Sequence, residues 1–366
     1  MKKRLIIPIT SLLALLAAFG IGALIILANG DSPVQAYGAL LRGAFGSPRG
    51  IASTLSSATP LIFTGLSVAV AFKAGMANIG AEGQLYMGGM AAAVVALFVP
   101  APSIILIPLS LLAAFVIGGL YGAIPAVLKV KTNTNEVVTT LMLNYIAKSF
   151  TSFLVNYPLK APGSPLGQTN NILDAAKLPI LFKGSRFNIG FIVAVLAAVA
   201  VAVMYRRSVM GYEMRVQGEN KLFASYVGID VNKRLTQGMF IGGGLAGLGG
   251  AVLVMGIQYK FVQGISPGYG FDGLTIALMA AFNAIAVIPI AILFGALRSG
   301  GLTMEMNTAV PSELGVVIQA VVILFMAARA PLSKKVSDYL DYRSTRRETG
   351  KTPPDPLKKA EEGGAV

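Results

Sequence analysis

The chain has 366 residues, of which 55% are hydrophobic and only 13% are charged, and its formal net charge at pH 7 is +14. A single soluble core cannot bury that much apolar surface, so we expect a protein embedded in lipid. The sequence contains no Cys and no His, which excludes disulfides, thiolate or imidazole metal sites, His-based acid–base catalysis and Ser-His triads.

The chain begins with basic residues at positions 2–4, and an apolar run follows as far as Ala28. This run is longer than the ~7–15 apolar residues of a secretory signal peptide, and further apolar runs follow it. We therefore interpret residues 5–28 as a retained first membrane helix.

Apolar windows close to the ~20 residues that a helix needs to cross a bilayer recur along the whole chain. They predict ten transmembrane helices, of which the eighth and ninth are short enough to indicate a broken pair. The windows fall at residues 5–28, 51–72, 79–99, 103–128, 135–156, 188–205, 235–257, 272–286, 287–304 and 313–330.

The basic residues are distributed unevenly between the two sides of these spans. With the N-terminus inside, most of the 30 Lys and Arg residues lie on the cytoplasmic side, and the positive-inside rule places both termini there. Nucleic acid is not an expected partner, because no basic patch is interleaved with aromatic residues. Lys148 falls within the fifth span, where both a pathway role and snorkelling to an interface fit a charged side chain.

Residues 78–84, NIGAEGQ, place a carboxylate and two amides between apolar runs that would otherwise cross the membrane without interruption. Polar groups in such a place are buried in protein or line a wet cavity. Two interpretations stay open. In one, Asn78 caps a helix and Glu82 binds free backbone N–H groups; in the other, Asn78, Glu82 and Gln84 line a substrate pathway.

A second polar cluster runs along one side of the fifth predicted helix, starting at Thr134. Its Thr and Asn residues recur at spacings of three to five, which puts their side chains on one face of a helix. Interhelical hydrogen bonds and a substrate path both fit this pattern. The candidate pathway residues of this cluster are Asn135, Glu136, Thr140 and Asn144.

The longest predicted external segment, residues 157–187, is rich in Pro, Gly and Asn. This composition is typical of ordered turns or a mobile surface rather than a domain, and it offers a surface to an external partner. The tail at 331–366 mixes both charges with Pro, so we expect a cytoplasmic, partly disordered segment. The sequence thus predicts one transmembrane domain, residues 1–330, followed by this tail.

The polar stretch at 206–234 carries six basic residues and separates two long apolar runs. Within it, Asn220 to Val227 predict a helix of about two turns that Gly228 ends. The pattern is typical of a cytoplasmic docking helix and equally of a helix lying on the membrane surface. The apolar residues of this helix share one face: Leu222, Phe223, Tyr226 and Val227.

Two stretches match the dinucleotide-binding pattern G-x-G-x-x-G, at residues 242–247 and 268–273. Neither follows a strand in a βαβ unit. We assign the first to close helix packing through Gly243 and Gly247. The second predicts a loop that ends at a helix N-cap, Asp272, with Phe271 and Asp272 as secondary candidates for a substrate contact. The sequence therefore predicts no nucleotide site in this chain.

Five segments, in this order and at these spacings, resemble the permease subunits of bacterial ABC importers of the ribose/branched-chain amino acid type. Within that type, they look like the nucleoside-uptake permeases that work with basic-membrane-protein lipoproteins. The resemblance runs from about Leu5 to Ala330. It departs at residues 281–285, where relatives usually have a Gly-rich turn with Asn-Pro or a similar pair. The segments are NIGAEGQLYMGG (78–89), TNEVVTTLMLNYIA (134–147), GYEMRVQGENKLFASYVGI (211–229), GYGFDGLTIAL (268–278) and PSELGVVIQAVVILFMAA (311–328).

The resemblance implies an all-α type II importer fold in a bacterial cell membrane. The implied partners are a second permease in a heterodimer, two cytoplasmic ABC ATPase subunits and an external substrate-binding lipoprotein. No cofactor and no enzymatic activity belong to this chain, since ATP and Mg²⁺ bind to the ATPase. The resemblance also assigns residues 211–229 as the coupling helix, which ATP-driven closure of the ATPase pair would move. The coupling residues it implies are Glu219, Asn220, Leu222, Phe223, Tyr226, Val227 and Gly228.

Together these features predict a permease that passes a nucleoside or a related small polar solute inward without altering it. Two alternatives stay open. One is a simple-sugar or branched-chain amino acid permease of the same class, because polar amides serve bases, riboses and sugars alike. The other is an ion-coupled secondary transporter or channel, which would work without ATPase partners.

Overall fold

The computed structural model describes residues 19–28 and 30–308, together with the single positions 17, 310, 317, 320 and 321. Much of the first predicted span, nearly all of the last one at 313–330, and the whole tail lie outside the described residues. The chain forms two compact units. One comprises residues 1–39 and 304–366, and the other, called the central unit below, comprises residues 40–303.

The ten-span interpretation leaves residues 29–50 in an external loop, but the structure forms a helix there. An apolar helix, Phe19–Ala28, is followed by α2, Pro33–Phe45, which begins with a proline at its first position. The Tyr37 hydroxyl donates to the carbonyl oxygen of Phe19 at 2.6 Å, and the two rings meet edge to face. The sequence prediction missed α2 because, at 13 residues, it is too short to register as a span.

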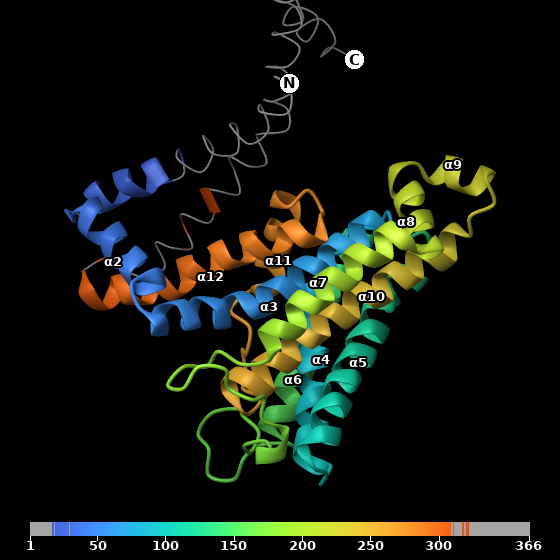
Figure 1. Cartoon of the computed structure of the whole chain (residues 1–366). Helices are drawn as coiled ribbons and strands as arrows, with labels where there is room; N and C mark the ends of the chain where they lie inside the picture. Colours follow the sequence, from blue (N-terminus) through green and yellow to red (C-terminus); the bar gives the residue numbers. More distant parts are fainter. Residues whose placement is uncertain are drawn as a thin grey trace, which may run out of the picture. The chain divides into compact units, whose positions relative to one another are not determined.

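Most of the described residues are helical, and the only strand-like contacts among them are isolated bridges. The predicted all-α class is therefore confirmed for this part of the chain (Figure 1). After α2 the elements are α3 (Pro48–Lys73), α4 (Ala81–Phe98), α5 (Ser103–Thr132), α6 (Glu136–Asn156), a 3₁₀ turn (Asp174–Ala176), α7 (Gly190–Arg207), α8 (Val209–Glu219), α9 (Lys221–Tyr226), α10 (Val231–Val252), a π-helix (Leu253–Gln258), α11 (Tyr269–Met279) and α12 (Ala284–Asn307).

Among the described residues, six helices are long and apolar enough to cross a membrane: α3, α4, α5, α7, α12, and α10 together with its π-helical end. The predicted count of ten is not confirmed by the described residues. α6 has 21 residues, or about 30 Å, which is enough to span a bilayer. It is less apolar than the six because Thr, Asn, Ser and Lys side chains recur along it.

The predicted break between the eighth and ninth spans lies in a different place. We expected helices at 272–286 and 287–304, whereas α11 ends at Met279 and α12 begins at Ala284 and runs for 24 residues. Ala281 and Phe282 adopt positive φ angles of 47° and 57° in the turn between them, and the Phe282 ring stacks on Phe72 of α3. Of α11 and α12, only α11 is too short to cross a bilayer, since its 11 residues are about 16 Å long.

α10 lies at the centre of the helix packing and contacts α3, α4 and α5 (Figure 1). Its glycines allow this close approach. A Cβ at Gly243 would lie 2.9 Å from the Cα of Gly122, and one at Gly247 would lie 3.1 Å from the carbonyl carbon of Ala114, both on α5. The predicted packing role of Gly243 and Gly247 is confirmed.

Replacing Gly247 by Leu is expected to lower the stability of the fold by at least about 1–3 kcal/mol, because the side chain must push α5 and α10 apart. Circular dichroism melting of the purified permease in detergent measures the effect. Leu120→Phe provides the control, since Leu120 lies on α5 and is 54% exposed. Equal melting temperatures for Gly247→Leu and the wild type would contradict the close packing of the two helices.

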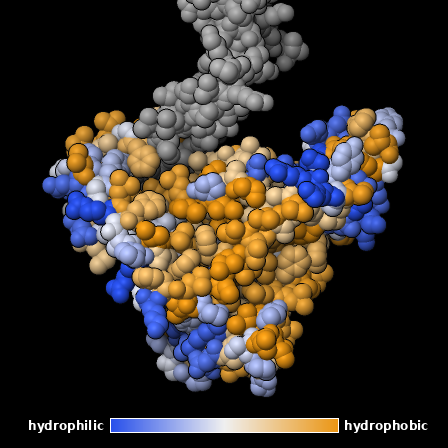
Figure 2. Space-filling model, viewed as in Figure 1, coloured by the Kyte–Doolittle hydropathy of each residue, from blue (hydrophilic) through white to orange (hydrophobic). Residues whose placement is uncertain are grey.

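The surface of the central unit shows where a membrane fits. On the face drawn in Figure 2, apolar side chains cover the middle of the unit and hydrophilic ones gather towards its ends. One end carries α8 and α9, and the other carries the loop at 157–189 between α6 and α7 (Figure 1). With six apolar helices of spanning length, this is the surface of a multi-pass membrane protein.

Candidate functional site

Two helices begin inside the central unit, each after an irregular segment. α3 ends in a Schellman turn at Gly75, which has a φ of +82°, and the Met76 N–H donates to the Ala71 carbonyl oxygen at 3.1 Å. Residues 76–80 then run without helical structure, so α4 begins only at Ala81. Residues 259–268 likewise lead from the π-helix to α11, which begins at Tyr269.

The starts of α4 and α11 meet at Glu82. Gly270 packs so closely against Glu82 that a Cβ on this glycine would lie 2.7 Å from the Glu82 Cβ. Lys148, the thirteenth residue of α6, faces the same carboxylate, about 18 Å along the helix from its start. The meeting point is therefore deep within the length of a spanning helix.

The Glu82 side chain is 0% exposed and holds the first turn of α11. Its Oε2 accepts hydrogen bonds from the Gly270 N–H at 2.7 Å and from the Ser266 hydroxyl at 3.0 Å. Its Oε1 accepts no hydrogen bond from a described residue and lies 3.6 Å from the Lys148 Nζ. A carboxylate at a helix start binds free N–H groups and is favoured by the helix dipole.

The capping interpretation of residues 78–84 is thus confirmed for Glu82 and wrong for Asn78. Glu82 does bind a free backbone N–H group, but that group belongs to α11 and not to its own helix. Asn78 does not occupy the N-cap of α4, which is Gly80; its Oδ1 accepts the Gly80 N–H at 2.9 Å. The sequence could not predict this pairing, because Glu82 and Gly270 are 188 residues apart.

The two amides of the 78–84 cluster satisfy each other. Asn78 and Gln84 exchange hydrogen bonds of 3.0 and 3.1 Å, and the Ser67 hydroxyl of α3 lies 3.4 Å from the Gln84 Oε1. Asn78 and Gln84 are 0% and 2% exposed. In this conformation the pair therefore joins α3 to α4 and does not face open space.

Asn144 of α6 joins the same cluster from another helix. Its Nδ2 donates to the Ile79 carbonyl oxygen at 2.9 Å, and its Oδ1 accepts the Gly83 N–H at 2.7 Å. Thr140, one turn earlier on α6, is 1% exposed and donates to the carbonyl oxygen of Glu136 at 2.7 Å. The structure thus brings Asn78, Glu82, Gln84 and Asn144 together.

Two other candidates of the α6 cluster lie apart from Glu82, at the start of the helix. Asn135 is the N-cap of α6 and accepts the Val137 N–H at 2.9 Å. The Glu136 carboxylate lies 3.2 Å from the Lys129 Nζ at the end of α5. Both residues therefore fix the turn between α5 and α6.

The predicted N-cap role of Asp272 is wrong. Gly268 is the N-cap of α11, and Asp272 lies within the first turn of the helix. Its carboxylate accepts a hydrogen bond of 2.7 Å from Arg298 of α12, and the Arg298 guanidinium lies 4.4 Å from the centre of the Tyr269 ring. This ion pair joins the short helix to the full-length one.

Phe271 and Lys148 form the open side of the Glu82 cluster. Phe271 is 43% exposed, and the Lys148 side chain is 40% exposed. The Lys148 Nζ lies 5.9 Å from the Phe271 ring centre and 5.6 Å from that of Tyr86. The sequence prediction missed Ser266, although a Ser just before a helix is typical of a capping residue.

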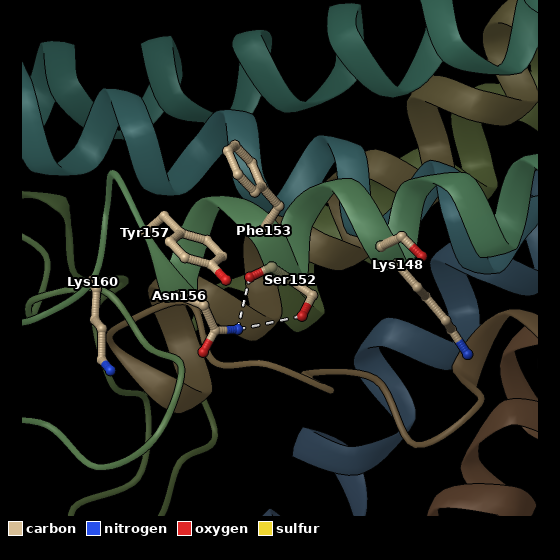
Figure 3. Close-up of a pocket in the computed structure, with 7 residues that line it drawn as sticks. Lys148, Ser152, Phe153, Asn156, Tyr157 and Lys160 are labelled. Atoms are coloured by element: carbon tan, nitrogen blue, oxygen red, sulfur yellow. Dashed lines mark hydrogen bonds between the residues drawn. The ribbon is translucent and has the colours of Figure 1, made fainter.

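A pocket of about 710 Å³ follows α6 from Lys148 towards the loop at 157–189 (Figure 3). We call it the α6 groove. At the end of the groove away from Lys148, the Asn156 Nδ2 donates to the Ser152 carbonyl oxygen at 2.8 Å and to the Gln263 Oε1 at 3.1 Å. These hydrogen bonds hold the Asn156 side chain in place. The groove is lined by Lys148, Ser149, Ser152, Phe153, Asn156, Tyr157 and Lys160.

The polar stretch at 206–234 folds into two helices rather than one. Asn220 ends α8 and begins α9, where its Oδ1 accepts the Phe223 N–H at 3.0 Å. α9 spans Lys221–Tyr226, and Gly228 follows with a φ of +84°. The predicted short helix is confirmed. Glu219 ends α8, and the apolar face of α9 is open to the surface, with exposed fractions of 72% for Leu222, 54% for Phe223, 86% for Tyr226 and 55% for Val227.

Apolar spanning helices, two helix starts that meet at a buried carboxylate, and a polar groove along α6 are the features of a multi-pass membrane protein with polar side chains at membrane depth. Residues 50–327 match the family model described as branched-chain amino acid transport system / permease component. The chain belongs to this family, so the predicted family of permeases is confirmed.

The relatives span almost the whole chain. The guanosine ABC transporter permease protein NupP of Bacillus subtilis is 38% identical over 90% of this chain and 95% of NupP. The glucose ABC transporter permease protein TsgB13 of Haloferax volcanii is 36% identical over 87% of this chain and 86% of TsgB13. The nucleoside ABC transporter permease protein NupB of Lactococcus lactis is 35% identical over 89% of this chain and 92% of NupB.

The first and third of these organisms each contain a further relative. The guanosine permease NupQ of Bacillus subtilis and the nucleoside permease NupC of Lactococcus lactis are each 28% identical to this chain over 68% of its length. Both bacteria thus have two different permeases of this kind, and this chain is more similar to NupP and NupB.

Proposed function

We propose that this chain is the membrane-spanning permease subunit of an ATP-driven importer for nucleosides or related small polar solutes. The 38% identity to a guanosine permease over 90% of the chain is the observation that carries the choice of solute. The chain moves the solute and leaves it chemically unchanged.

The solute path runs along α6. Lys148 and Ser149 line the α6 groove near the middle of a helix of spanning length, and Ser152 lines it one turn further along. Charged and hydroxyl side chains at that depth face water or protein rather than lipid. A second permease closes the other side of the path, and Phe271 and Glu82 lie beside it. Asn78, Gln84, Thr140 and Asn144 then support its wall in this conformation.

The assembly has the type II importer arrangement, with both permeases in a bacterial cell membrane. α8 and α9 face the cytoplasm, as do both termini, and the exposed apolar face of α9 enters a cleft in the ATPase. The two ATPase subunits bind ATP and Mg²⁺. An external substrate-binding lipoprotein delivers the solute at the end that carries the loop at 157–189.

The cognate binding protein can identify the solute. Calorimetry directly measures the affinity of that protein for each candidate solute. We expect tight binding of guanosine or another nucleoside. Similarity to the glucose permease TsgB13, at 36% identity, supports a sugar as the second candidate. Binding of glucose without any nucleoside would contradict the proposed solute.

The path is also testable from the permease itself, because the chain contains no Cys. A single Ser152→Cys change is expected to react with a charged, membrane-impermeant thiol reagent, and bound nucleoside should slow the reaction. Leu196→Cys provides the control. Leu196 lies on α7 and is 61% exposed, and its neighbours are apolar side chains that we assign to the lipid-facing surface. Labelling of position 152 no faster than that of position 196 would place the path elsewhere.

A further inference from the structure

α8 holds the end of α3. Gln217 of α8 is 0% exposed, and its Nε2 donates to the carbonyl oxygen of Ala74, the C-cap of α3, at 2.8 Å. Gly218 lies beside the same turn, where a Cβ would lie 3.1 Å from the carbonyl carbon of Lys73. Gly238 of α10 packs against the Ala74 side chain from another helix. The last turn of α3 is therefore wedged between α8 and α10 and hydrogen bonded to α8.

A short stretch, residues 75–81, leads from this fixed point to Glu82. Gly75 turns the chain at a φ of +82°, and Met76 and Asn78 are buried at 1% and 0% exposure. Residues 76–80 lie outside any helix, but hydrogen bonds join the stretch to the helices at both ends: the Met76 N–H donates to the Ala71 carbonyl oxygen of α3 at 3.1 Å, and the Gly80 carbonyl oxygen accepts the Gln84 N–H of α4 at 3.1 Å. Because its surroundings are closely packed, a displacement at one end moves the other.

A second segment reaches Glu82 from the opposite end of the central unit. The loop at 157–189 binds the π-helix and the residues after it, through the Leu178 N–H to the Met255 carbonyl oxygen at 3.0 Å and the Thr169 N–H to the Phe261 carbonyl oxygen at 2.9 Å. Residues 264–270 follow, and they supply both hydrogen-bond donors of Glu82. Segments from both ends of the unit thus converge on one carboxylate.

We propose that Gln217 is a positioning residue that transmits movement of α8 and α9, through Ala74 and residues 75–81, to Glu82 and the first turn of α11. This inference rests on the proposed function, because a partner must move α9. The Gln217 hydrogen bond makes the end of α3 follow α8. Glu82 then shifts Gly270, and with it the short helix that borders the α6 groove. Gln217 itself contacts no solute.

The test uses the complete transporter in proteoliposomes, with solute uptake and ATP hydrolysis measured in the same vesicles. Gln217→Met nearly keeps the side-chain volume and removes the donor. We expect the solute transported per ATP to fall about fivefold or more, the range of a coupling energy between two sites. A merely structural role would lower both activities with the amount of transporter and leave this ratio unchanged. Gln237→Met is the matched control, since Gln237 of α10 accepts from Arg234 at 2.7 Å.

Gly75→Ala provides a second variant that leaves the Gln217 hydrogen bond in place. If Gln217→Met does not assemble, this second variant tests the transmission through residues 75–81. A positive φ costs Ala about 1 kcal/mol, so the variant should assemble with a displaced connecting stretch and a similarly lowered ratio. A wild-type ratio in either assembled variant contradicts this inference alone. Absence of ATP-dependent uptake by the wild-type transporter contradicts the proposed function as well.

Discussion

Uptake is expected to fall to the level of empty vesicles when Phe223 and Tyr226 are both replaced by Asp. Their rings are 54% and 86% exposed on α9, and in the proposed assembly the ATPase covers this apolar surface. Buried aromatic residues at an interface each contribute about 2 kcal/mol or more, so the pair accounts for about 4 kcal/mol, or roughly a thousandfold in affinity. Two added carboxylates oppose docking further.

Co-purification of the ATPase with tagged permease measures this loss, and circular dichroism melting shows that the permease still folds. The control places the same change at the other end of the central unit, with Leu181 and Phe182 both replaced by Asp. These residues are 45% and 39% exposed in the loop at 157–189 and should leave ATPase binding intact. Full uptake in the Phe223/Tyr226 variant would contradict the coupling role of α9 and favour an ion-coupled transporter.

The Glu82→Leu change is expected to lower the stability of the permease by about 3–5 kcal/mol. It removes the acceptor of the Gly270 N–H and the Ser266 hydroxyl and leaves Lys148 without its partner. Glu82→Gln keeps an acceptor for Gly270 and should retain most of the stability. Circular dichroism melting in detergent ranks the stabilities of the wild type, Glu82→Gln and Glu82→Leu, and we expect that order from most to least stable.

A double change, Glu82→Leu with Lys148→Met, separates the ion pair from the hydrogen bonds. Removing both charges leaves no unpaired charge, so we expect the double variant to be more stable than Glu82→Leu alone. A Glu82→Leu permease that melts at the wild-type temperature would contradict the role of Glu82 in holding α11. With Lys148→Met measured alone as well, additive effects of the two changes would show that Lys148 does not interact with the carboxylate.

Elements governed by local sequence were predicted well. A helix was expected at 135–156 and is α6, Glu136–Asn156, since Asn135 caps it and an apolar pattern follows. The short helix from Asn220 to Val227 is α9, because Asn220 and Gly228 mark its two ends. The break at 280–283 was misplaced, because its turn is made by Ala281 and Phe282 at positive φ, where a sequence pattern leads one to expect Gly or Pro, and because the stack of Phe282 on Phe72 joins distant segments.

The candidate site was predicted in its residues rather than in its arrangement. Polar side chains between apolar runs drew attention to Asn78, Glu82, Gln84 and Asn144, and these do lie together. Their partners came from distant segments. The Glu82 bond to Gly270 spans 188 residues and the Gln217 bond to Ala74 spans 143, and no local pattern specifies such contacts. Spacing along one helix also could not separate Asn135, at the start of α6, from Asn144 beside Glu82.

ATP-dependent uptake tests the central claim most directly. The complete transporter, with this permease, its second permease, the ATPase and the binding protein, is reconstituted with ATP and Mg²⁺ on the ATPase side. Labelled guanosine and labelled glucose are supplied on the side of the binding protein. We predict guanosine accumulation that requires ATP hydrolysis and that excess unlabelled nucleoside abolishes. Guanosine accumulation driven by an ion gradient without ATP, or ATP-dependent accumulation of glucose alone, would contradict the account.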